Sequence, residues 1–331
     1  GNVVKVLHMM DTQKIFRSKR TEYPAIYDFE TGVLTIVKYI PLHGHSAYSI
    51  LDCISRPEDI AKKAELAIAV TDHGNMFGAL KFYKAMKKEG KKPIIGFEAY
   101  TSSLDYTYIS KDGDTLQSIC RENHVSVEDL LESNPSIILE DGSATIDEML
   151  VSPETLTVKS GQPFLIKKAN AKNHLVLLAE NETGYKNLVK LTSIGQEKYT
   201  RGRPQIDWDD LRNHHEGVVA LSACLAGELP RAILRGDMEQ ARKIIREMIS
   251  IFGKENYFLE IQRHGIPEED VLNPTLLELA KEFGLKVVAT ADNHFTNKED
   301  AAAHEAHLCI GTKSKLTDPN RWIFPGTGYH I

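Results

Sequence analysis

The chain is 331 residues long, with 42% hydrophobic and 26% charged residues, a composition typical of globular proteins and not of disordered chains. Its length allows one large α/β domain or two ordinary ones. The formal net charge of −6 does not favour non-specific binding to nucleic acid. The lysine-rich stretch at residues 81–92 is a candidate for a local basic groove, although the solvated end of an amphipathic helix is the simpler explanation for it.

Several classes of protein are disfavoured by the sequence. No apolar run approaches the roughly 20 residues that span a bilayer, and the N-terminus lacks the pattern of a secretory signal. Gly1 in place of methionine is typical of a processed or engineered chain. The four cysteines are widely spaced and form no Cys-x-x-Cys pair, which suits a reducing compartment better than a disulfide framework. We therefore expect a cytoplasmic protein that does not bind a membrane.

The pattern of apolar residues predicts the fold class. Residues 1–38 are expected to form an N-terminal extension, in which AIYDFETGVLTIVK predicts a hairpin through its Thr-Gly turn. From residue 39 on, short apolar runs alternate with amphipathic stretches, the rhythm of βα units around a parallel sheet or barrel. The predicted strands are Tyr39–His43, Leu66–Asp72, Pro93–Tyr100, His174–Ala179, Gly217–Ala223, Tyr257–Gln262 and Lys286–Asp292. Seven strands favour a distorted α/β barrel over the alternative, an open doubly wound sheet.

A long insertion interrupts this rhythm between the third and fourth predicted strands. Residues 104–171 are predicted to form a small βααβ module, grafted onto a barrel loop where insertions are tolerated best. The barrel would then comprise residues 39–103 and 172–331.

Polar side chains of three kinds lie at or near the ends of most predicted strands, the edge where ligands gather in such folds. They are His43, His45, Asp72, His73, Glu98, His174, Cys224, Asp292 and His294. Imidazole, carboxylate and thiolate are the side chains that bind zinc-like ions. Because there are too many ligands for one tetrahedral ion, we expect a centre of two or three ions, which typically holds a phosphate and activates a water molecule.

Other motifs carry less weight. The sequence AHEAH at residues 303–307 has its histidines three apart, not four, so it is not a His-Glu-x-x-His motif. His264, near the end of the sixth predicted strand, could line the site without binding metal. Cys53, Cys120 and Cys309 lack a matched set of ligands and are expected to be structural. No phosphate-binding loop, dinucleotide fingerprint or serine nucleophile with partners is recognisable.

Five segments of the sequence carry a family resemblance. They are PLHGHSAYSILD, AVTDHGNMFGALKFYKAMKKEGKKPIIGFEAY, HLVLLAENETGYKNL, ALSACLAGELPRAIL and VVATADNHFTNKEDAAAHE. In this order they closely resemble the PHP (polymerase and histidinol phosphatase) domain of bacterial or phage C-family replicative DNA polymerases, the DNA polymerase III alpha subunits. The segment DPNRWIFPGTGYHI is similar to the boundary region of that domain. The resemblance covers about residues 39–104 and 173–331.

This resemblance implies a distorted seven-stranded barrel with up to three divalent ions at its mouth. Carried over to this sequence, the implied ligands of the first ion, which are also the implied catalytic residues, are His43, His45, Glu98 and Asp292. Glu98 would bridge to a second ion.

The resemblance also implies the ligands of the other two ions. The second would be held by Glu98, His174 and Cys224, and the third by Asp52, His73 and His294. Zinc suits this mixture of imidazole, thiolate and carboxylate best, with manganese or magnesium as alternatives.

For members with an intact site, the resemblance implies a metal-dependent phosphoesterase that works as a 3′–5′ exonuclease and proofreads the 3′ end of the primer strand. The implied partners are DNA, the remainder of the polymerase chain and other replisome subunits. The polymerase palm with its catalytic carboxylates is missing from these residues, so nucleotidyl transfer would belong to the full-length protein.

Two alternative functions stay open at this point. One is a phosphomonoesterase of the histidinol-phosphatase kind, against which the polymerase-like segments TGYKNL and AGELPRAIL argue. The other is a catalytically silent scaffold of the polymerase, against which the presence of an acceptable ligand at all nine positions argues.

The insertion departs from the family pattern. Its segment DGDTLQSICRENHVSVEDLLESNP resembles a lysin-motif module. Such modules commonly bind glycans, an activity with no obvious use in a replicase, so we expect a structural or docking role here.

Overall fold

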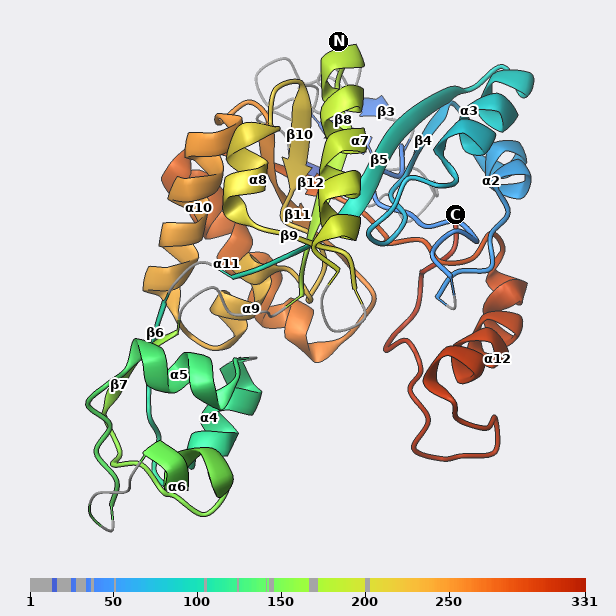
Figure 1. The fold of residues 1–331 in the computed structure, drawn as a ribbon. Helices are drawn as coiled ribbons and strands as arrows, with labels where there is room; N and C mark the ends of the chain where they lie inside the picture. The colour runs from blue at the N-terminus through green and yellow to red at the C-terminus, as the bar shows by residue number, and fades with distance from the viewer. Residues whose placement is uncertain are drawn as a thin grey trace.

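A curled mixed sheet forms the centre of the molecule (Figure 1). The structure is a computed structural model that describes residues 14–16, 25–27, 34–36, 39–50, 52–103, 106–123, 125–140, 142, 146–166, 172–199 and 203–331. The strands of the central sheet are β4 (Ala67–Val70), β5 (Lys92–Thr101), β8 (Asn173–Ala179), β10 (Val218–Leu221), β11 (Tyr257–Ile261) and β12 (Lys286–Ala289). Their order is β12-β11-β10-β8-β5-β4, and the short β9 (Gln205–Ile206) pairs with β5. The predicted barrel-like α/β fold is confirmed.

The βα rhythm predicted a parallel sheet, but the observed sheet is mixed. β8 runs antiparallel to both of its neighbours, β5 and β10, while the pairs β4–β5, β10–β11 and β11–β12 are parallel. The physical reason lies in the insertion. Its residues leave the end of β5 and return beside it, so that Thr101 pairs with Asn173. A connection that returns at the same end of the strands gives antiparallel neighbours, because no crossover helix carries the chain back to the opposite end of the sheet.

The first predicted strand, Tyr39–His43, is wrong as a regular strand, but its backbone closes the sheet. The carbonyl oxygens of Pro41 and Gly44 accept hydrogen bonds from the amides of Ala69 and Thr71, both at 2.8 Å. On its other side, Gly44 forms a parallel bridge with Asn293, which follows β12. The segment therefore lies between β4 and β12 and takes the place of the one predicted strand that is not regular. Pro41 has no N–H to donate to a ladder, which keeps this pairing short.

Two apolar layers explain why the predicted strands are continuous apolar runs. In β8, Leu175 and Leu177 belong to the cluster that packs against the helices, whereas Val176 and Leu178 belong to the cluster enclosed by the sheet. Successive side chains of a strand point to opposite faces, so a strand covered on both sides is apolar throughout.

Helices cover the outside of the sheet (Figure 1). They are α2 (Pro57–Lys63), α3 (Ala79–Lys88), α7 (Glu182–Glu197), α8 (Trp208–Asn213), α9 (Glu228–Leu234), α10 (Met238–Phe252) and α11 (Pro267–Phe283). The 3-10 turn η1 (Lys298–Asp300) and α12 (Ala301–Thr312) follow, and α12 lies apart from the sheet in Figure 1. The side chains of Asn181, Asp207 and Asp237 accept hydrogen bonds from backbone amides at the starts of α7, α8 and α10. None of the described helices combines the length and apolarity that crossing a bilayer requires.

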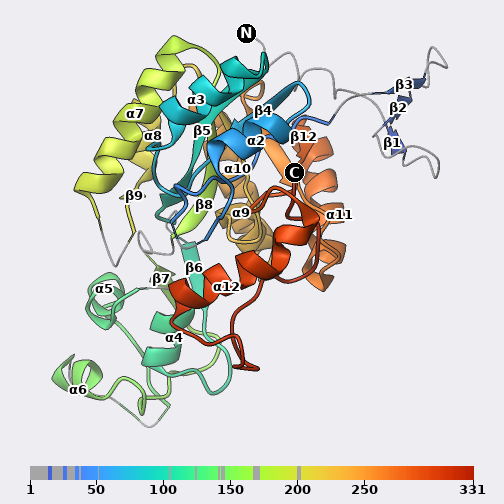
Figure 2. The ribbon, with the colours of Figure 1, turned by 90° about the vertical axis from the view of Figure 1, so that its right-hand side faces the viewer.

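The insertion forms a module at one end of the barrel (Figures 1 and 2). Its strands β6 (Tyr106–Ile109) and β7 (Pro163–Ile166) pair antiparallel. Between them in the sequence lie the helices α4 (Leu116–Asn123), α5 (Val127–Ser133) and α6 (Ile146–Val151). The predicted βααβ order missed α6, a helix of six residues. The buried apolar residues of the module form a cluster of their own, which includes Leu116, Ile119 and Phe164.

A small antiparallel sheet lies near the N-terminus (Figure 2). It consists of β1 (Lys14–Phe16), β2 (Ala25–Tyr27) and β3 (Leu34–Ile36), with Tyr27 opposite Leu34. The Thr-Gly turn of the predicted hairpin lies outside the described residues.

Candidate metal centre

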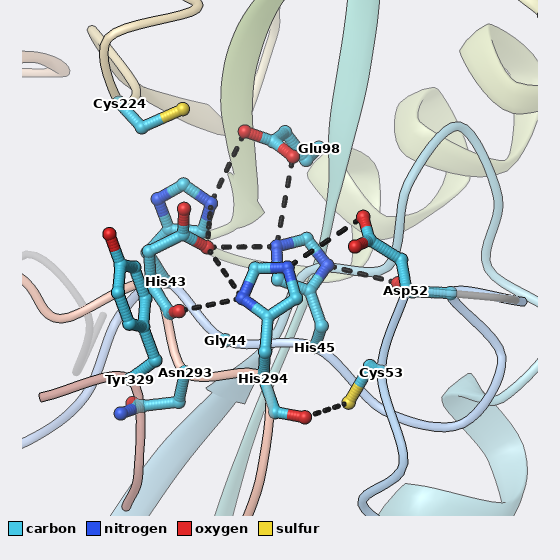
Figure 3. Close-up of polar contacts among 12 residues, drawn as sticks. His43, Gly44, His45, Asp52, Cys53, Glu98, Cys224, Asn293, His294 and Tyr329 are labelled. Carbon is cyan, nitrogen blue, oxygen red and sulfur yellow. Dashed lines mark hydrogen bonds and ion pairs between the residues drawn. The ribbon is translucent and has the colours of Figure 1, made fainter. Parts of the chain in front are cut away.

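All nine predicted ligands lie in one cluster at one end of the sheet. Figure 3 labels His43, His45, Asp52, Glu98, Cys224 and His294 among them. The closing segment carries His43 and His45, and the ends of β4, β10 and β12 lead to His73, Cys224, Asp292 and His294. β5 supplies Glu98, β8 supplies His174, and a loop before α2 supplies Asp52. The position of His174 at the start of its strand follows from topology. Since β8 is antiparallel to its neighbours, its first residues meet their carboxyl ends.

The backbone at two strand ends has an unusual conformation. Ala223 after β10 and Asp292 after β12 have φ angles of 62° and 45°, in the region that residues with a Cβ atom rarely adopt. Such conformations cluster at functional sites, where the surrounding structure holds them in place. They occur here directly before Cys224 and at a predicted ligand.

Glu98 is the central carboxylate of the cluster, and it is 1% exposed. Its Oε1 lies 3.2 Å from Nε2 of His43 and 2.9 Å from Nδ1 of His174. Its Oε2 lies 2.6 Å from Nδ1 of His73. Nε2 of His45 lies 3.7 Å from the same Oε2. One carboxylate therefore faces four imidazoles with both oxygens, an arrangement suited to bridging two ions.

Asp292 is the second carboxylate among the imidazoles. A single oxygen, Oδ1, lies 3.2 Å from Nε2 of His43 and 3.1 Å from Nε2 of His45. The same oxygen lies 3.6 Å from Nδ1 of His294. His43, His45 and Asp292 thus present one ligand atom each toward a common point, all within 4.8 Å of one another.

Asp52 approaches the cluster from a loop. Its Oδ2 lies 2.7 Å from Nε2 of His73 and 3.8 Å from Nε2 of His294. Two hydrogen bonds hold this loop in place. The Asp52 carbonyl oxygen lies 2.7 Å from Nε2 of His304, and the Cys53 thiol donates to the His294 carbonyl oxygen. Asp52 and Cys224 flank the cluster on opposite sides of the view in Figure 3.

The geometry groups the ligands somewhat differently from the sets that the family resemblance implies. Three groups have ligand atoms within 4.8 Å of one another: His43, His45 and Asp292; His73, Glu98 and His174; and His45, His73 and His294. The first group matches three of the four expected ligands of the first ion. His73 belongs to both of the other groups, and its two ring nitrogens lie beside Glu98 and beside Asp52. Cys224 stands farther out, with its Sγ atom 3.7 Å from Nδ1 of His174.

The charges of the cluster are strongly coupled. Burial alone would raise the pKa of Glu98, but His174, His73 and His43 outweigh it and hold the pKa well below its usual range. Burial would lower the pKa of His43, and here Asp292, Glu260 and Glu98 outweigh it and raise the pKa.

His45 and Cys224 behave differently from these groups. For His45, burial together with the neighbouring His73 and His294 lowers the pKa to about 3, so this imidazole is neutral and has a lone pair to offer. Burial, followed by the charges of Glu98 and Asp292, raises the pKa of the Cys224 thiol. The thiol must lose its proton before its sulfur can bind a metal ion.

Buried polar atoms that lack a well-aligned hydrogen bond test whether this site fits a metal ion. Among the described residues, four ligand atoms of the cluster are buried and have no hydrogen bond of good geometry: Nε2 of His43, Nδ1 of His73, Oε2 of Glu98 and Nε2 of His294. A buried polar atom without a partner is costly, so native structures rarely keep one without a reason. Imidazole nitrogens and carboxylate oxygens are ligands of divalent ions, and the residues therefore fit such a group.

The sequence analysis missed Glu260, a buried carboxylate that supports the site. Its Oε1 lies 2.7 Å from Nδ1 of His43, on the side of the ring away from Glu98 and Asp292. The signal for it was present, since a glutamate in the middle of the apolar run YFLEIQ is unusual in a buried strand.

Asp72 was recognised at its strand end, but its contacts give it a different place from the nine ligands. It accepts hydrogen bonds from the Ser46 amide (2.7 Å) and from the hydroxyls of Ser46 and Ser49. The Ser49 hydroxyl also lies 2.9 Å from Nδ1 of His45. Asp72 therefore positions the loop that carries the His-x-His motif.

A cavity of about 230 Å³ opens beside the cluster. Its lining includes the predicted ligands Asp52, His73, His174, Cys224, Asp292 and His294. These six ligands can therefore be reached by a small molecule or by the end of a chain, whereas His43, His45 and Glu98 lie buried behind them.

Comparison with known proteins agrees with the family resemblance. The model of the PHP domain family matches residues 41–264. The chain is 37% identical over 298 residues to the DNA polymerase III subunit alpha of Borreliella burgdorferi, covering 89% of this chain and 21% of that protein. It is 36% identical over 301 residues to the corresponding subunit of Thermus aquaticus, covering 89% and 20%. The chain thus spans about a fifth of the length of these relatives.

Among solved structures, an amidohydrolase from Chromobacterium violaceum aligns with 77% of this chain and 87% of its own, at 16% identity and a TM-score of 0.33, a likeness too distant to bear on function. The family model, in contrast, matches more than half of the 331 residues, in a region that holds all strands of the central sheet except β12 and seven of the nine predicted ligands. The chain belongs to the PHP domain family.

Proposed function

We propose that this chain is the N-terminal PHP domain of a DNA polymerase III alpha subunit and that it hydrolyses phosphodiester bonds at the 3′ end of a primer strand, with the help of bound divalent ions. The observation that carries the proposal is the convergence of nine histidine, carboxylate and thiol side chains in one cluster, six of which line an accessible cavity. The similarity to DNA polymerase III alpha subunits supports DNA as the substrate.

The residues of the cluster would divide the work among them. Divalent ions bound at such a site lower the pKa of a water molecule and neutralise charge on a phosphate. His43, His45 and Asp292 would hold one ion, and Glu98, with oxygens facing different imidazoles, would bridge to a neighbour. His174 and Cys224 would complete the site of that neighbour, and the mixture of ligands favours zinc over manganese or magnesium.

Asp52, His73 and His294 would hold a third ion at the edge of the cluster. Nε2 of His73 and Nε2 of His294 face the same oxygen of Asp52. On this proposal the partners of the chain are DNA, the rest of the polymerase and other replisome subunits, and the protein acts in the cytoplasm.

A nuclease assay tests the proposal. Purified protein is incubated with a primer that carries a label and a mismatched 3′ end, in the presence of zinc, manganese or magnesium. The double variant His43→Ala, Glu98→Ala should abolish metal-dependent shortening from the 3′ end. The matched control is His215→Ala, Glu278→Ala, which removes an exposed histidine and an exposed glutamate away from the cluster and should leave the rate unchanged.

The assay also separates the other functions. Hydrolysis of a small phosphate monoester with no shortening of DNA would replace the exonuclease by a phosphomonoesterase. Bound metal, measured by elemental analysis, without hydrolysis of either substrate would leave the domain as a scaffold of the polymerase.

A further inference from the structure

The cavity beside the cluster has two chemically different walls. One wall consists of the predicted metal ligands. The remainder of the lining is mostly apolar and includes four rings, those of His264, Trp322, Phe324 and Tyr329. A site built only to hold an inorganic phosphate would need no such aromatic wall, so the lining calls for a ligand with both a charged and a flat apolar part.

The aromatic wall begins at the cluster and reaches the surface. The Phe324 ring packs edge-to-face against His294, with ring centroids 4.5 Å apart and an angle of 85°. Trp322 in turn packs against Phe324, with ring centroids 4.9 Å apart. Trp322 is 50% exposed, so part of its indole surface is free for another ring. The rings therefore extend from a predicted metal ligand outward to solvent.

His264 supplies the polar contact within this wall. It is 5% exposed and stacks on Tyr329, with centroids 3.9 Å apart and an angle of 8°. Its Nδ1 lies 2.9 Å from the Thr327 carbonyl oxygen, which fixes Nδ1 as the donor. Nε2, left as the acceptor in the neutral ring, is buried without a hydrogen-bond partner among the described residues. An N–H or O–H of a ligand in the cavity would satisfy it.

We infer that this cavity binds the terminal nucleoside of a single-stranded 3′ end, with the base stacked on Trp322 and Phe324 and a polar group of the nucleoside donating to His264. The inference rests on the proposed function, because it assigns the phosphate of the same nucleotide to the metal cluster. A base has a flat face whatever its identity, so stacking on aromatic rings would accept any sequence, as removal of mismatched ends requires.

Binding without turnover tests the inference first. The chain has two tryptophans, and the other, Trp208, is buried, so quenching of fluorescence by a ligand reports on Trp322. We expect thymidine monophosphate to quench the fluorescence of metal-loaded protein, and deoxyribose phosphate, which lacks the base, not to do so. The quenching should disappear in Trp322→Phe, where only Trp208 remains. Equal responses to the two ligands would overturn the inference.

Cleavage then tests the role of the stacking. The substrates are two labelled oligonucleotides that differ only in the last residue, thymidine or an abasic analogue. The protein should remove thymidine faster by roughly tenfold, the size expected for one base–aromatic stack. Trp322→Ala should abolish this preference, Trp322→Phe should keep most of it, and the control Tyr185→Ala, an exposed aromatic on α7, should keep all of it.

The two experiments distinguish the inference from the proposed function. Shortening of both oligonucleotides at the same rate would overturn the nucleoside site and leave the exonuclease standing. Quenching by thymidine monophosphate but not by the sugar phosphate, without shortening of either oligonucleotide, would support the nucleoside site and overturn the exonuclease.

Discussion

Nδ1 of His43 lies 2.7 Å from Oε1 of Glu260, and both side chains are fully buried. This contact occupies one ring nitrogen and leaves the other, Nε2, facing Glu98 and Asp292. Glu260 is held in turn, since it accepts hydrogen bonds from the Thr290 hydroxyl and from the Gln262 amide. A carboxylate behind a histidine fixes both the orientation and the tautomer of a metal ligand.

Replacing Glu260 by glutamine should therefore weaken metal binding. Glu260→Gln keeps the size of the side chain but removes the negative charge behind His43, so we expect a loss of affinity of about 10- to 100-fold. The measurement is a competition titration with a chelator of known affinity. Glu278→Gln, at an exposed position of α11, is the matched control and should bind as the unchanged protein does. An unaltered affinity in Glu260→Gln would mean that the carboxylate has no part in the metal site.

Removing the metal should lower the thermal stability of the protein. An ion that binds only the folded state, present at a hundred times its dissociation constant, stabilises that state by about 3 kcal/mol, or roughly 5–10 °C in melting temperature. Calorimetry before and after chelation measures this shift, and returning zinc should reverse it. The His43→Ala, Glu98→Ala variant keeps Asp52, His73 and His294, so chelation should shift its melting temperature less than that of the unchanged protein. If chelation left the melting temperature of the unchanged protein where it was, a tightly bound centre would be contradicted.

The strands and the ligand types of this protein could be predicted from its sequence because both depend on local patterns. Strands buried on both faces are apolar throughout, and β8 and β10 show this pattern clearly. Polar residues lie near one end of each of these strands, His174 at the start of β8 and Cys224 after β10, so all of the ligands except Asp52 could be collected strand by strand. The family resemblance added the grouping of the ligands, which spacing alone does not determine.

What the sequence did not predict depends on distant contacts. The direction of β8 is set by where the insertion returns to the sheet, and no pattern within β8 records it. Residues 39–43 have a strand-like sequence, yet they lie at the seam of the barrel, where the backbone of this segment forms only a few hydrogen bonds on each side. Glu260 acts through His43, 217 positions away in the sequence. α6 is too short to show a helical period.

The insertion should be removable without unfolding the barrel. Its apolar cluster is separate from the two clusters of the sheet, and the residues that flank it, Thr101 and Asn173, are neighbours across two paired strands. Replacing residues 104–171 by a short glycine-rich turn should thus keep the circular dichroism and the metal affinity of the parent. The isolated module should give dispersed amide resonances, because it has strands, helices and a core of its own. A deletion variant that fails to fold would show that the barrel depends on the module.

The stability of the module should fall at alkaline pH because of Cys120. This thiol is buried, and burial together with Glu128 and Asp129 raises its pKa to about 11. The ordinary pKa of a cysteine is about 8.5, so the unfolded chain ionises first and the folded chain resists it. A raised pKa of an acid contributes stability below the unfolded value and loses it as the pH rises through the interval between the two values.

The check is urea unfolding of the isolated module at about pH 8 and at about pH 10, values on either side of the ordinary cysteine pKa. We expect the free energy of unfolding to decrease between them, and Cys120→Ala to reduce that decrease, because alanine has no proton to lose. Cys120→Ala should also be less stable at the lower pH, since the thiol belongs to the buried cluster of the module, so the comparison rests on the change with pH. An identical change in both proteins would show that the ionisation of Cys120 is not linked to folding.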